Sequence, residues 1–463
     1  MANSILTDVE PASRPHQTRL GEGVVAWKFM PAMRALLWVG GFLLALWLCV
    51  QWGMGTSVRN DFTQNVWLPA RLVLDGANPY DAHPSEVDVA LGEHRSAFDS
   101  FNSGSRFYFI YPLWVALVMA PFGAMPLAAA TALWRALNLV LLVWGLAAIL
   151  RASNPLFRQW QAVAVVATVF TVLLGLVYRE SILTLYLGQF AIIELGLLAG
   201  VWGWLIRSSG REGKALLLGD ALVGVALAVL ATKPQAVGLP VALIVLWALF
   251  RRRLAIPASA AIAMSLLILG PVPFYPDSVK DWLWVIFGGG QAGSQTEVSA
   301  SVWGLSYQWL GEAAPWRVVA AILSLLGVAL LLPRWWRDLR DKASPMPLSL
   351  PLTICMNSIV SPYMLGYEHV LLLMPALVLL AAAGLPGKEP SPEGIAFRDD
   401  PGKPGNTNNL KWTRISIYLW LAILPYIVVV AQAATQREYP AILQSIPMVV
   451  LCWKARLYWR TKA

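Results

Sequence analysis

The sequence predicts an all-α membrane protein built from many transmembrane helices. Of its 463 residues, 57% are hydrophobic and only 13% are charged, whereas soluble domains carry about 25% charged residues. The apolar residues fall into long runs, and the first, 34–54, has no charge after Arg34 and is long enough to cross a bilayer as a helix. The 23 tryptophans fit a chain with many interfacial anchors. This composition excludes a globular protein with a single anchor.

Thirteen apolar runs are candidate spans, at 34–54, 108–122, 127–150, 160–178, 181–206, 215–232, 235–250, 254–274, 316–333, 345–361, 367–384, 412–433 and 441–453. The polar N-terminal arm and the basic C-terminal tail are both expected in the cytoplasm. Two ends on one side require an even number of crossings, so we predict about 12 transmembrane helices. The run 108–122 is short and is interrupted by Pro112 and Pro121, which predicts a re-entrant or broken helix there.

The net charge of +9 gives information on topology rather than on nucleic-acid binding. Lys and Arg gather in clusters beside apolar runs, at 151–158, 207–214, 251–253, 334–342 and 454–462. We expect the clusters at 207–214, 251–253, 334–342 and 454–462 on the cytoplasmic side and expect no nucleic-acid partner. The three cysteines, Cys49, Cys355 and Cys452, lie in apolar runs and show neither a disulfide framework nor a metal-ligand spacing.

The runs divide the chain into four expected parts: a cytoplasmic arm 1–33, a transmembrane core 34–384, a cytoplasmic linker 385–411, and a C-terminal hairpin with a basic tail, 412–463. The linker is rich in Pro, Gly and Asn, which predicts flexibility. The core has two expected outer loops, 55–107 and 275–315. Within the second loop, the Gly- and Ser-rich stretch 288–301 is either a slack connector or a mobile loop that closes over a substrate.

One carboxylate follows the first span directly, at the start of the long polar loop. Asp61 stands in Arg59-Asn60-Asp61-Phe62. A general base must lie within hydrogen-bond reach of the hydroxyl proton that it removes. A carboxylate directly after a membrane span lies at the membrane face, where it could act as the general base for an acceptor hydroxyl. The alternative is that Asp61 caps a helix lying on the membrane surface.

Further polar residues lie at membrane depth, where ionisable groups usually mark function. Lys233 stands between two apolar runs and either holds a lipid phosphate or reaches for the headgroups. Gln189 and Glu194 form a polar stripe, which helix–helix hydrogen bonding also explains. Glu368 and His369 lie at a helix start, where His369 binds a phosphate or a sugar hydroxyl, or is structural.

The usual motifs of hydrolytic, ATP-driven and redox enzymes do not occur in a plausible context. The chain has no Walker loop, nucleophile elbow, zinc-protease motif or dinucleotide fingerprint. A donor that carries its own activation, such as a lipid-linked phosphosugar, needs none of these motifs.

Six short motifs occur in a fixed order: Asp61, Gly76-x-Asn78-Pro79-Tyr80, Ile110-Tyr111-Pro112-Leu113, Gly188-Gln189, Lys233-Pro234-Gln235, and Ser361-Pro362 with Glu368-His369. In this order and spacing, over about 55–380, the chain resembles glycosyltransferase family 87. These are polyprenyl-phosphate-mannose-dependent mannosyltransferases of the GT-C superfamily. One departure is Leu113, where family members often have a second proline.

The resemblance implies an inverting transfer of a sugar, expected to be mannose, from a polyprenyl-phosphate donor to a lipid or glycan acceptor. It implies a GT-C-type bundle with its active site on the extracytoplasmic face of the plasma (inner) membrane, a catalytic aspartate carried onto Asp61, and a functional histidine carried onto His369. No cofactor and no metal are expected. The candidate donor-phosphate residues are Lys233, His369, Arg71 and Arg106, and the candidate substrate residues are Gln189, Gln235, Tyr111, Asn78, Tyr80 and Glu368.

Two other classes of function remain open. A transporter or flippase for lipid or polysaccharide would carry ionisable residues on broken helices near the midplane, whereas here they are expected at one face. An O-antigen-ligase-like enzyme would use a lipid-diphosphate donor and a large, basic late loop, whereas this chain has its long loop first.

Overall fold

A computed structural model describes residues 61–92, 109–154, 162–208, 211–287, 296–312, 315–383, 394–397, 407–435, 442–455 and 457–460, together with 39–41, 43–44 and 47–48. The chain divides into two compact units, Met1–Leu44 and Ala45–Ala463. In the first unit the described residues are helical. The arm 1–33, most of the first run and Arg106 lie outside the described residues. The other candidate site residues all lie in the second unit.

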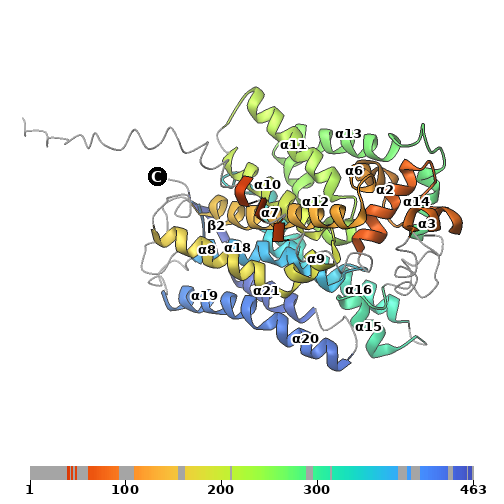
Figure 1. The fold of residues 1–463 in the computed structure, drawn as a ribbon. Helices are drawn as coiled ribbons and strands as arrows, with labels where there is room; N and C mark the ends of the chain where they lie inside the picture. Colours follow the sequence, from red (N-terminus) through yellow and green to blue (C-terminus); the bar gives the residue numbers. More distant parts are fainter. Residues whose placement is uncertain are drawn as a thin grey trace, which may run out of the picture. The chain divides into compact units, whose positions relative to one another are not determined.

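The second unit is built almost entirely of helices, as predicted (Figure 1). Its elements are η2 (Thr63–Trp67), α2 (Leu68–Leu74), α3 (Pro84–Leu91), α5 (Leu113–Val118), α6 (Ala120–Gly123), α7 (Leu127–Ser153), α8 (Ala162–Val177), α9 (Arg179–Leu187), α10 (Ala191–Arg207), α11 (Lys214–Leu230), α12 (Pro234–Phe250), α13 (Ala255–Leu269), α14 (Ser278–Phe287), α15 (Val302–Leu310), α16 (Trp316–Arg340), α17 (Leu350–Val360), η6 (Gly366–Leu372), α18 (Leu373–Ala383), β1 (Gly394–Phe397), α19 (Thr407–Ala422), α20 (Leu424–Thr435), α21 (Ile442–Ala455) and β2 (Leu457–Arg460).

The two short strands are the exception to the all-α prediction. Strand β1 pairs antiparallel with β2, with Gly394 opposite Arg460. Strand β1 and the start of α19 lie in 385–411, which its composition predicted to be a flexible linker.

The helices confirm a membrane protein. Among the described residues, α7, α16 and the combined helix Gly366–Ala383 are long and apolar enough to cross a bilayer, and the pair α8–α9, bent by 61°, is a fourth candidate. The count of about 12 spans remains a prediction. The span Gly366–Ala383 is wholly buried, whereas only 17% of the apolar window of α16 is buried. The first segment therefore lies in the protein interior, and the second presents an apolar surface to its surroundings.

Two runs are divided by breaks in the helix. The run 108–122 is broken as predicted: α5 ends at Val118, α6 is four residues long, and α7 begins after Pro126. The run 181–206, predicted as one span, is instead two helices, because α9 ends at Leu187 and is followed by Gly188 in the left-handed conformation with φ of 73°. A Cβ at Gly188 would also lie 2.5 Å from the Cβ of Phe62. Both the left-handed backbone conformation and this close contact therefore favour glycine at the break.

The second outer loop is more structured than its composition predicts. It contains α14 and α15, and Ala300 is buried, with its N–H donating to the Met364 carbonyl at 2.5 Å. Ser301 Oγ donates to the Ser361 carbonyl at 2.7 Å. The end of the Gly- and Ser-rich stretch is thus packed against the rest of the protein. The remaining residues of the predicted mobile loop, 288–295, lie outside the described residues.

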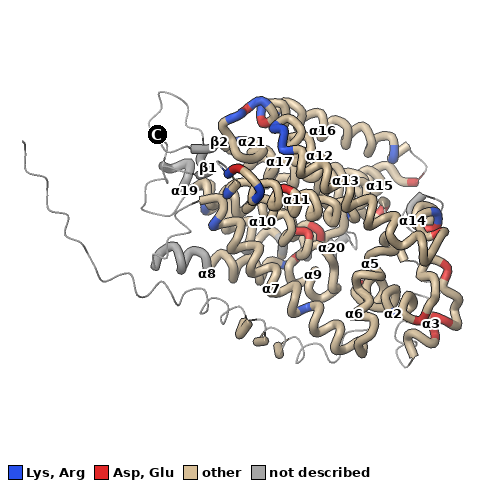
Figure 2. The backbone as a smooth tube through the Cα atoms, turned by 90° about the horizontal axis from the view of Figure 1, so that it is seen from above, with Lys and Arg blue, Asp and Glu red and all other residues tan. Residues whose placement is uncertain are grey.

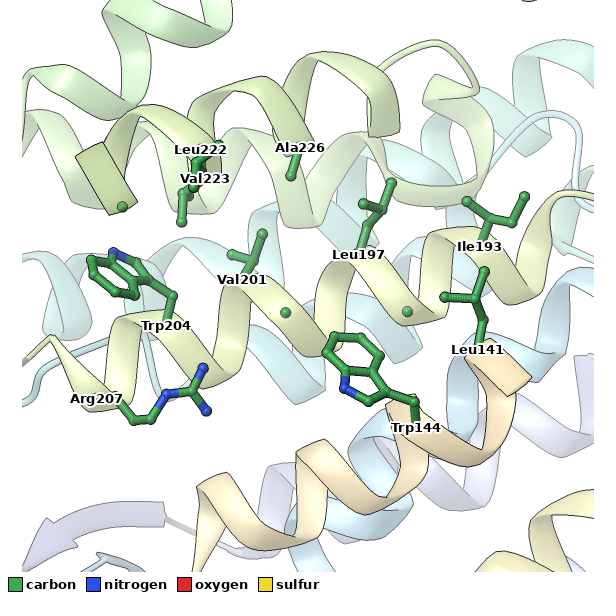
Figure 3. Close-up of a pocket in the computed structure, with 13 residues that line it drawn as sticks. Leu141, Trp144, Ile193, Leu197, Val201, Trp204, Arg207, Leu222, Val223 and Ala226 are labelled. Carbon is green, nitrogen blue, oxygen red and sulfur yellow. The ribbon is translucent and has the colours of Figure 1, made fainter. Parts of the chain in front are cut away.

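Helix pairs distant in sequence build the core. Helix α7 packs on α10, α11 on α13, and α12 and α21 on α17. Acidic residues appear on α3 and beside α14, whereas Lys and Arg gather where α16 and α21 lie (Figure 2). Helices α7, α10 and α11 also line an apolar pocket on their shared face (Figure 3).

Candidate active site

Asp61 is held where the first outer loop meets the break between α9 and α10. It precedes the π-helix η2, and its neighbour Phe62 is fully buried against the rings of Phe122 and Trp134, with ring centroids 6.1 and 5.4 Å away. The indole Nε1–H of Trp134 donates to the Gly188 carbonyl at 2.8 Å. Packing of Phe62 on Gly188 therefore fixes Asp61 beside the next residue, Gln189.

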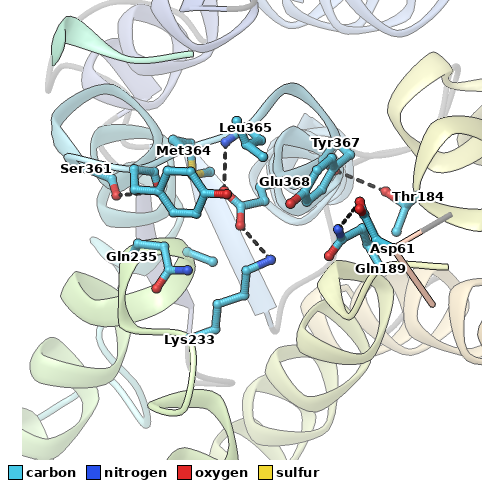
Figure 4. A network of polar contacts seen from close by, with 12 residues as sticks. Asp61, Thr184, Gln189, Lys233, Gln235, Ser361, Met364, Leu365, Tyr367 and Glu368 are labelled. Atoms are coloured by element: carbon cyan, nitrogen blue, oxygen red, sulfur yellow. Dashed lines mark hydrogen bonds and ion pairs between the residues drawn. The ribbon is translucent and has the colours of Figure 1, made fainter. Parts of the chain in front are cut away.

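The Asp61 carboxylate is partly buried and accepts a hydrogen bond from a neutral side chain. Gln189 Nε2 donates to Asp61 Oδ2 (Figure 4). Burial raises the pKa of Asp61 above its usual 3.8, and the Gln189 hydrogen bond and the positive charge of Lys233 oppose this rise. A carboxylate with a raised pKa is a stronger base than an exposed one, as proton removal requires.

Lys233 forms a buried ion pair with Glu368. Lys233 ends the α11–α12 turn just before Pro234, and its Nζ lies 2.6 Å from Glu368 Oε1, with the two side chains 5% and 0% exposed. The Glu368 Oε2 also accepts from the Leu365 backbone N–H at 2.9 Å, and the ammonium lies over the Tyr367 ring, 5.1 Å from its centroid. The side chain therefore faces the interior and does not reach the surface as a snorkelling lysine would.

An apolar cavity of about 290 Å³ borders this ion pair. Its wall comes from α5, α10, α11 and α13, and includes Trp114, Phe190 and Ile193. Lys233 and Glu194 bring charge to this wall, and Tyr111 and Thr232 bring hydroxyl groups. Of the predicted polar stripe, Glu194 thus lines a cavity, whereas Gln189 bonds to Asp61. A ligand with a charged group and an apolar body fits the chemistry of this cavity.

Of the candidate residues, the structure brings together Asp61, Gln189, Lys233, Glu368, Tyr111 and Gln235 (Figure 4). Tyr111 is 6% exposed and packs edge-on against Phe190, 5.2 Å between centroids. Gln235 lies in the first turn of α12, where its carbonyl accepts from Asn357 Nδ2 at 2.9 Å. The cluster therefore contains residues from five of the six short motifs, and its role as a substrate site remains a prediction.

Three other candidates from the first outer loop make contacts that shape the loop instead. Arg71 is exposed and pairs with Asp75 at 3.1 Å. Asn78 Nδ2 donates to Asp281 of α14 at 3.1 Å, and Tyr80 donates its hydroxyl to the Tyr111 carbonyl at 2.6 Å. Asn78 and Tyr80 thus hold the loop against α14 and the start of α5 rather than joining the cluster, and burial raises the pKa of Tyr80 well above 10, so its hydroxyl stays a donor.

His369 is fully buried within η6, and its ring Nδ1 lies 3.2 Å from the Gly366 carbonyl. Its own carbonyl accepts from Tyr178 at 3.3 Å, and Tyr178 also donates to Gln444 of α21 at 2.6 Å. Gln444 in turn donates to Glu180 at 2.6 Å. His369 therefore belongs to an enclosed network that links α9, η6 and α21, which agrees with the structural alternative for this residue.

Tyr367 was not among the residues predicted from sequence. Its ring lies under the Lys233 ammonium, and its carbonyl accepts from Thr184 Oγ1 at 3.1 Å. Tyr367 directly precedes the candidate residue Glu368 in the sequence. This position is the feature of the sequence that could have identified it as a site residue. Among the described residues, no group of three or more His, Cys, Asp or Glu side chains is placed to hold a metal ion, and the absence of a metal requirement remains a prediction.

The comparison with protein families gives one match. The model of glycosyltransferase family 87 matches residues 109–362, more than half of the chain. No curated protein and no solved structure matches. Tyr111, Gln189, Lys233 and Gln235 lie inside the matched segment, whereas Asp61 and Glu368 lie outside it.

Proposed function

The chain belongs to glycosyltransferase family 87, and on that premise we propose that it transfers mannose from a polyprenyl-phosphate donor to a hydroxyl of a lipid or glycan acceptor. That it is a membrane glycosyltransferase follows from the family and from its apolar helices. The donor, the sugar and the acceptor are the proposal.

One arrangement carries the proposal: a carboxylate lies near a buried ammonium, and the ammonium lines an apolar cavity. Asp61 lies within electrostatic reach of Lys233, and Lys233 lines the cavity. A polyprenyl-phosphate sugar has three parts, an apolar chain, a phosphate and a sugar. The cavity suits the first isoprene units, the ammonium suits the phosphate, and the carboxylate is left for the acceptor hydroxyl.

In the proposed reaction, Asp61 takes the proton of the acceptor hydroxyl as its oxygen attacks the anomeric carbon. The new bond joins the acceptor oxygen to that carbon, and the bond from that carbon to the phosphate oxygen breaks. Polyprenyl phosphate leaves with the bonding electrons, and Lys233 stabilises the negative charge that develops on it. Attack from the opposite face inverts the configuration, so a β-linked donor gives an α-linked product.

The ion pair with Glu368 has a role in the free enzyme. A buried ammonium without a partner is costly, and Glu368 supplies the partner at 2.6 Å. When the donor phosphate arrives, the same ammonium can interact with both anions, because it has three N–H donors. Glu368 thereby keeps Lys233 charged and aimed before the donor binds.

The proposed site faces the extracytoplasmic side of the plasma membrane. Lys233 and the cluster Arg251–Arg253 lie at opposite ends of α12, whose 17 residues span about 25 Å. Clusters of Lys and Arg favour the cytoplasmic side. With Arg251–Arg253 on that side, Lys233 at the other end of α12 is expected on the extracytoplasmic side. The test is labelling of single cysteines by an impermeant reagent in a chain without its native cysteines. Position 280, in the second outer loop, should react from outside and position 252 should not; the reverse result would overturn this topology.

A transfer assay tests the function. Purified protein in lipid vesicles receives polyprenyl phosphates carrying mannose, glucose or arabinose, with a membrane glycolipid extract as acceptor. We expect a mannosylated product that α-mannosidase cleaves. Transfer only from a lipid-diphosphate donor would favour the O-antigen-ligase-like alternative. Movement of lipid across the vesicle membrane without any covalent product would favour a flippase.

A further inference from the structure

A second pocket lies on the face shared by α7, α10 and α11, apart from the Asp61 cluster (Figure 3). Its volume is about 530 Å³, and thirteen residues line it. All of these are apolar residues or glycines except one, Arg207, at the C-terminal end of α10. The proposed transfer reaction leaves this pocket without a role.

Glycines keep the pocket open. At Gly196 and Gly200 of α10, a Cβ would meet nothing closer than Leu141 at 3.8 Å and Trp144 at 3.6 Å, so the floor of the pocket is bare backbone. At the rim, Leu222 and Trp144 are 62% and 38% exposed. The pocket is therefore open at an apolar surface of the kind that faces lipid, and a hydrocarbon chain can enter it from the side.

One end of the pocket is cationic. The guanidinium of Arg207 lies along Gly203, where a Cβ would meet it at 3.0 Å, and that of Arg211 lies 5.7 Å from the centre of the Trp204 ring. Two acidic residues are close: Asp220 is bound by Arg253, and Glu212 is exposed beside Arg211. Trp204, which lines the pocket, thus has the Arg211 guanidinium over its ring and donates its indole N–H to Asp220 at 2.9 Å.

We propose that this pocket binds an anionic membrane phospholipid, with an acyl chain along α10 and α11 and the phosphate beside Arg207 and Arg211. Arginine suits a phosphate because its planar fork of donors can bind two oxygens at once, even when one N–H is already engaged. The apolar wall supplies the affinity for the chain, and the cations select the headgroup.

The donor lipid is a weaker candidate for the same pocket. The pocket shares Ile193 and Leu197 with the cavity at Lys233, so a long isoprenoid tail could extend into it. Such a tail has its single charged group at Lys233 and nothing for Arg207 to bind. Helix α10 is 17 residues long, about 25 Å, which leaves room for two lipids that approach from opposite ends.

Photo-crosslinking tests the proposal. The probes are phosphatidylglycerol and phosphatidylcholine with the same diazirine acyl chain, added to the full-length protein in nanodiscs, and labelled peptides are mapped. We expect phosphatidylglycerol to label α10 and α11 more strongly. Arg207→Gln should reduce this labelling about fivefold, which corresponds to the ~1 kcal/mol that one arginine contributes at an anionic surface. The matched control is Arg340→Gln, which removes an arginine stacked on Trp336, 4.2 Å from its ring centre, at the end of α16.

A second variant tests the chain portion of the pocket. Gly200→Leu fills the floor and should reduce labelling by both probes, and its melting temperature in detergent shows whether it is folded. Equal labelling by the two headgroups, or unchanged labelling of Arg207→Gln, would overturn the proposal. So would complete displacement of the probe by polyprenyl phosphate but not by unlabelled phosphatidylglycerol, because the pocket would then belong to the donor.

Discussion

Two buried ion pairs lie near opposite ends of α12, and they differ in what surrounds them. Arg253 binds both oxygens of Asp220 and donates to Ser208 at 2.9 Å, and Trp204 donates to the same carboxylate at 2.9 Å. Lys233 has Glu368 as its ion-pair partner and borders the 290 Å³ cavity. Further hydrogen-bonding side chains surround the Arg253–Asp220 pair. The Lys233–Glu368 pair instead borders a cavity.

The difference indicates different roles for similar chemistry. A buried ion pair with every group satisfied fixes the helices that carry it, here α11 and the turn between α12 and α13. A buried ion pair beside a cavity can accept a further anion without breaking the packing. Charge and burial alone would not separate the two, so catalysis and stability have to be measured separately in variants of each pair.

The largest expected effect comes from Asp61→Asn. The amide keeps the size of the side chain but cannot take the acceptor proton, so we expect transfer to fall about 100- to 10,000-fold, with near-normal expression and donor binding. The measurement is the initial rate of mannosyl transfer. Asp75→Asn, which changes an exposed acid paired with Arg71, is the matched control. A rate above half of wild type for Asp61→Asn would exclude Asp61 as the base.

Arg253→Gln should change stability instead of catalysis. It leaves the Asp220 carboxylate buried without its cation, which costs roughly 3–5 kcal/mol of folding free energy. Thermal unfolding in detergent should show a clear drop in melting temperature, while the folded fraction keeps its specific activity. Arg252→Gln, at the exposed neighbouring arginine, should leave both unchanged. A stable but inactive Arg253→Gln variant would contradict the proposed division of roles.

Lys233→Met tests the pair beside the cavity. It keeps most of the apolar stem and removes the charge that stabilises the leaving phosphate, so we expect a loss of about 2–4 kcal/mol of transition-state stabilisation. Steady-state kinetics with varied donor concentration measure it. Lys280→Met, which removes an exposed lysine paired with Asp277 at 3.7 Å, is the control. Wild-type kinetics for Lys233→Met would leave the phosphate site unassigned.

The smallest expected effect is a shift of the pH profile. Asp61 must be deprotonated to act as a base, so activity should fall as the pH drops through its pKa, which burial raises above 3.8. The Gln189 hydrogen bond lowers that pKa, so Gln189→Leu should move the acid limb of kcat/KM to higher pH. Gln308→Leu in α15 should not move it. A limb that stays fixed in Gln189→Leu would assign it to another group.

Sequence predicted the residues that meet near Asp61 better than it predicted the loops, and the role of these residues as a site remains a prediction. Gln189 and Lys233 stood out because polar groups are rare in apolar runs, and the structure places both near Asp61. Arg71 and Asn78 were harder to judge, because a polar residue in a polar loop carries no such signal. The contact of Asn78 with Asp281 depends on how the loop packs against α14, some 200 residues further along.

The helices were predictable where the apolar run was uninterrupted, as in α11 and α12. The break at Gly188 was missed because its neighbours remain apolar and the run continues through it. Only the approach of Phe62 from the first outer loop shows why the chain needs a glycine there. A hydropathy pattern describes one segment at a time. The break at Gly188 depends on the contact between two segments, the first outer loop and the α9–α10 run.

Gln444 sets a limit on how this protein can be shortened. It lies beyond the family-matched segment, yet it donates to Glu180 and accepts from Tyr178, and its carbonyl accepts from Trp420 at 2.9 Å. A chain ending after α18 would keep every residue of the Asp61 cluster and lose Gln444 from the buried Glu180. We therefore expect a stable fragment to extend at least to α21, beyond the segment that matches the family.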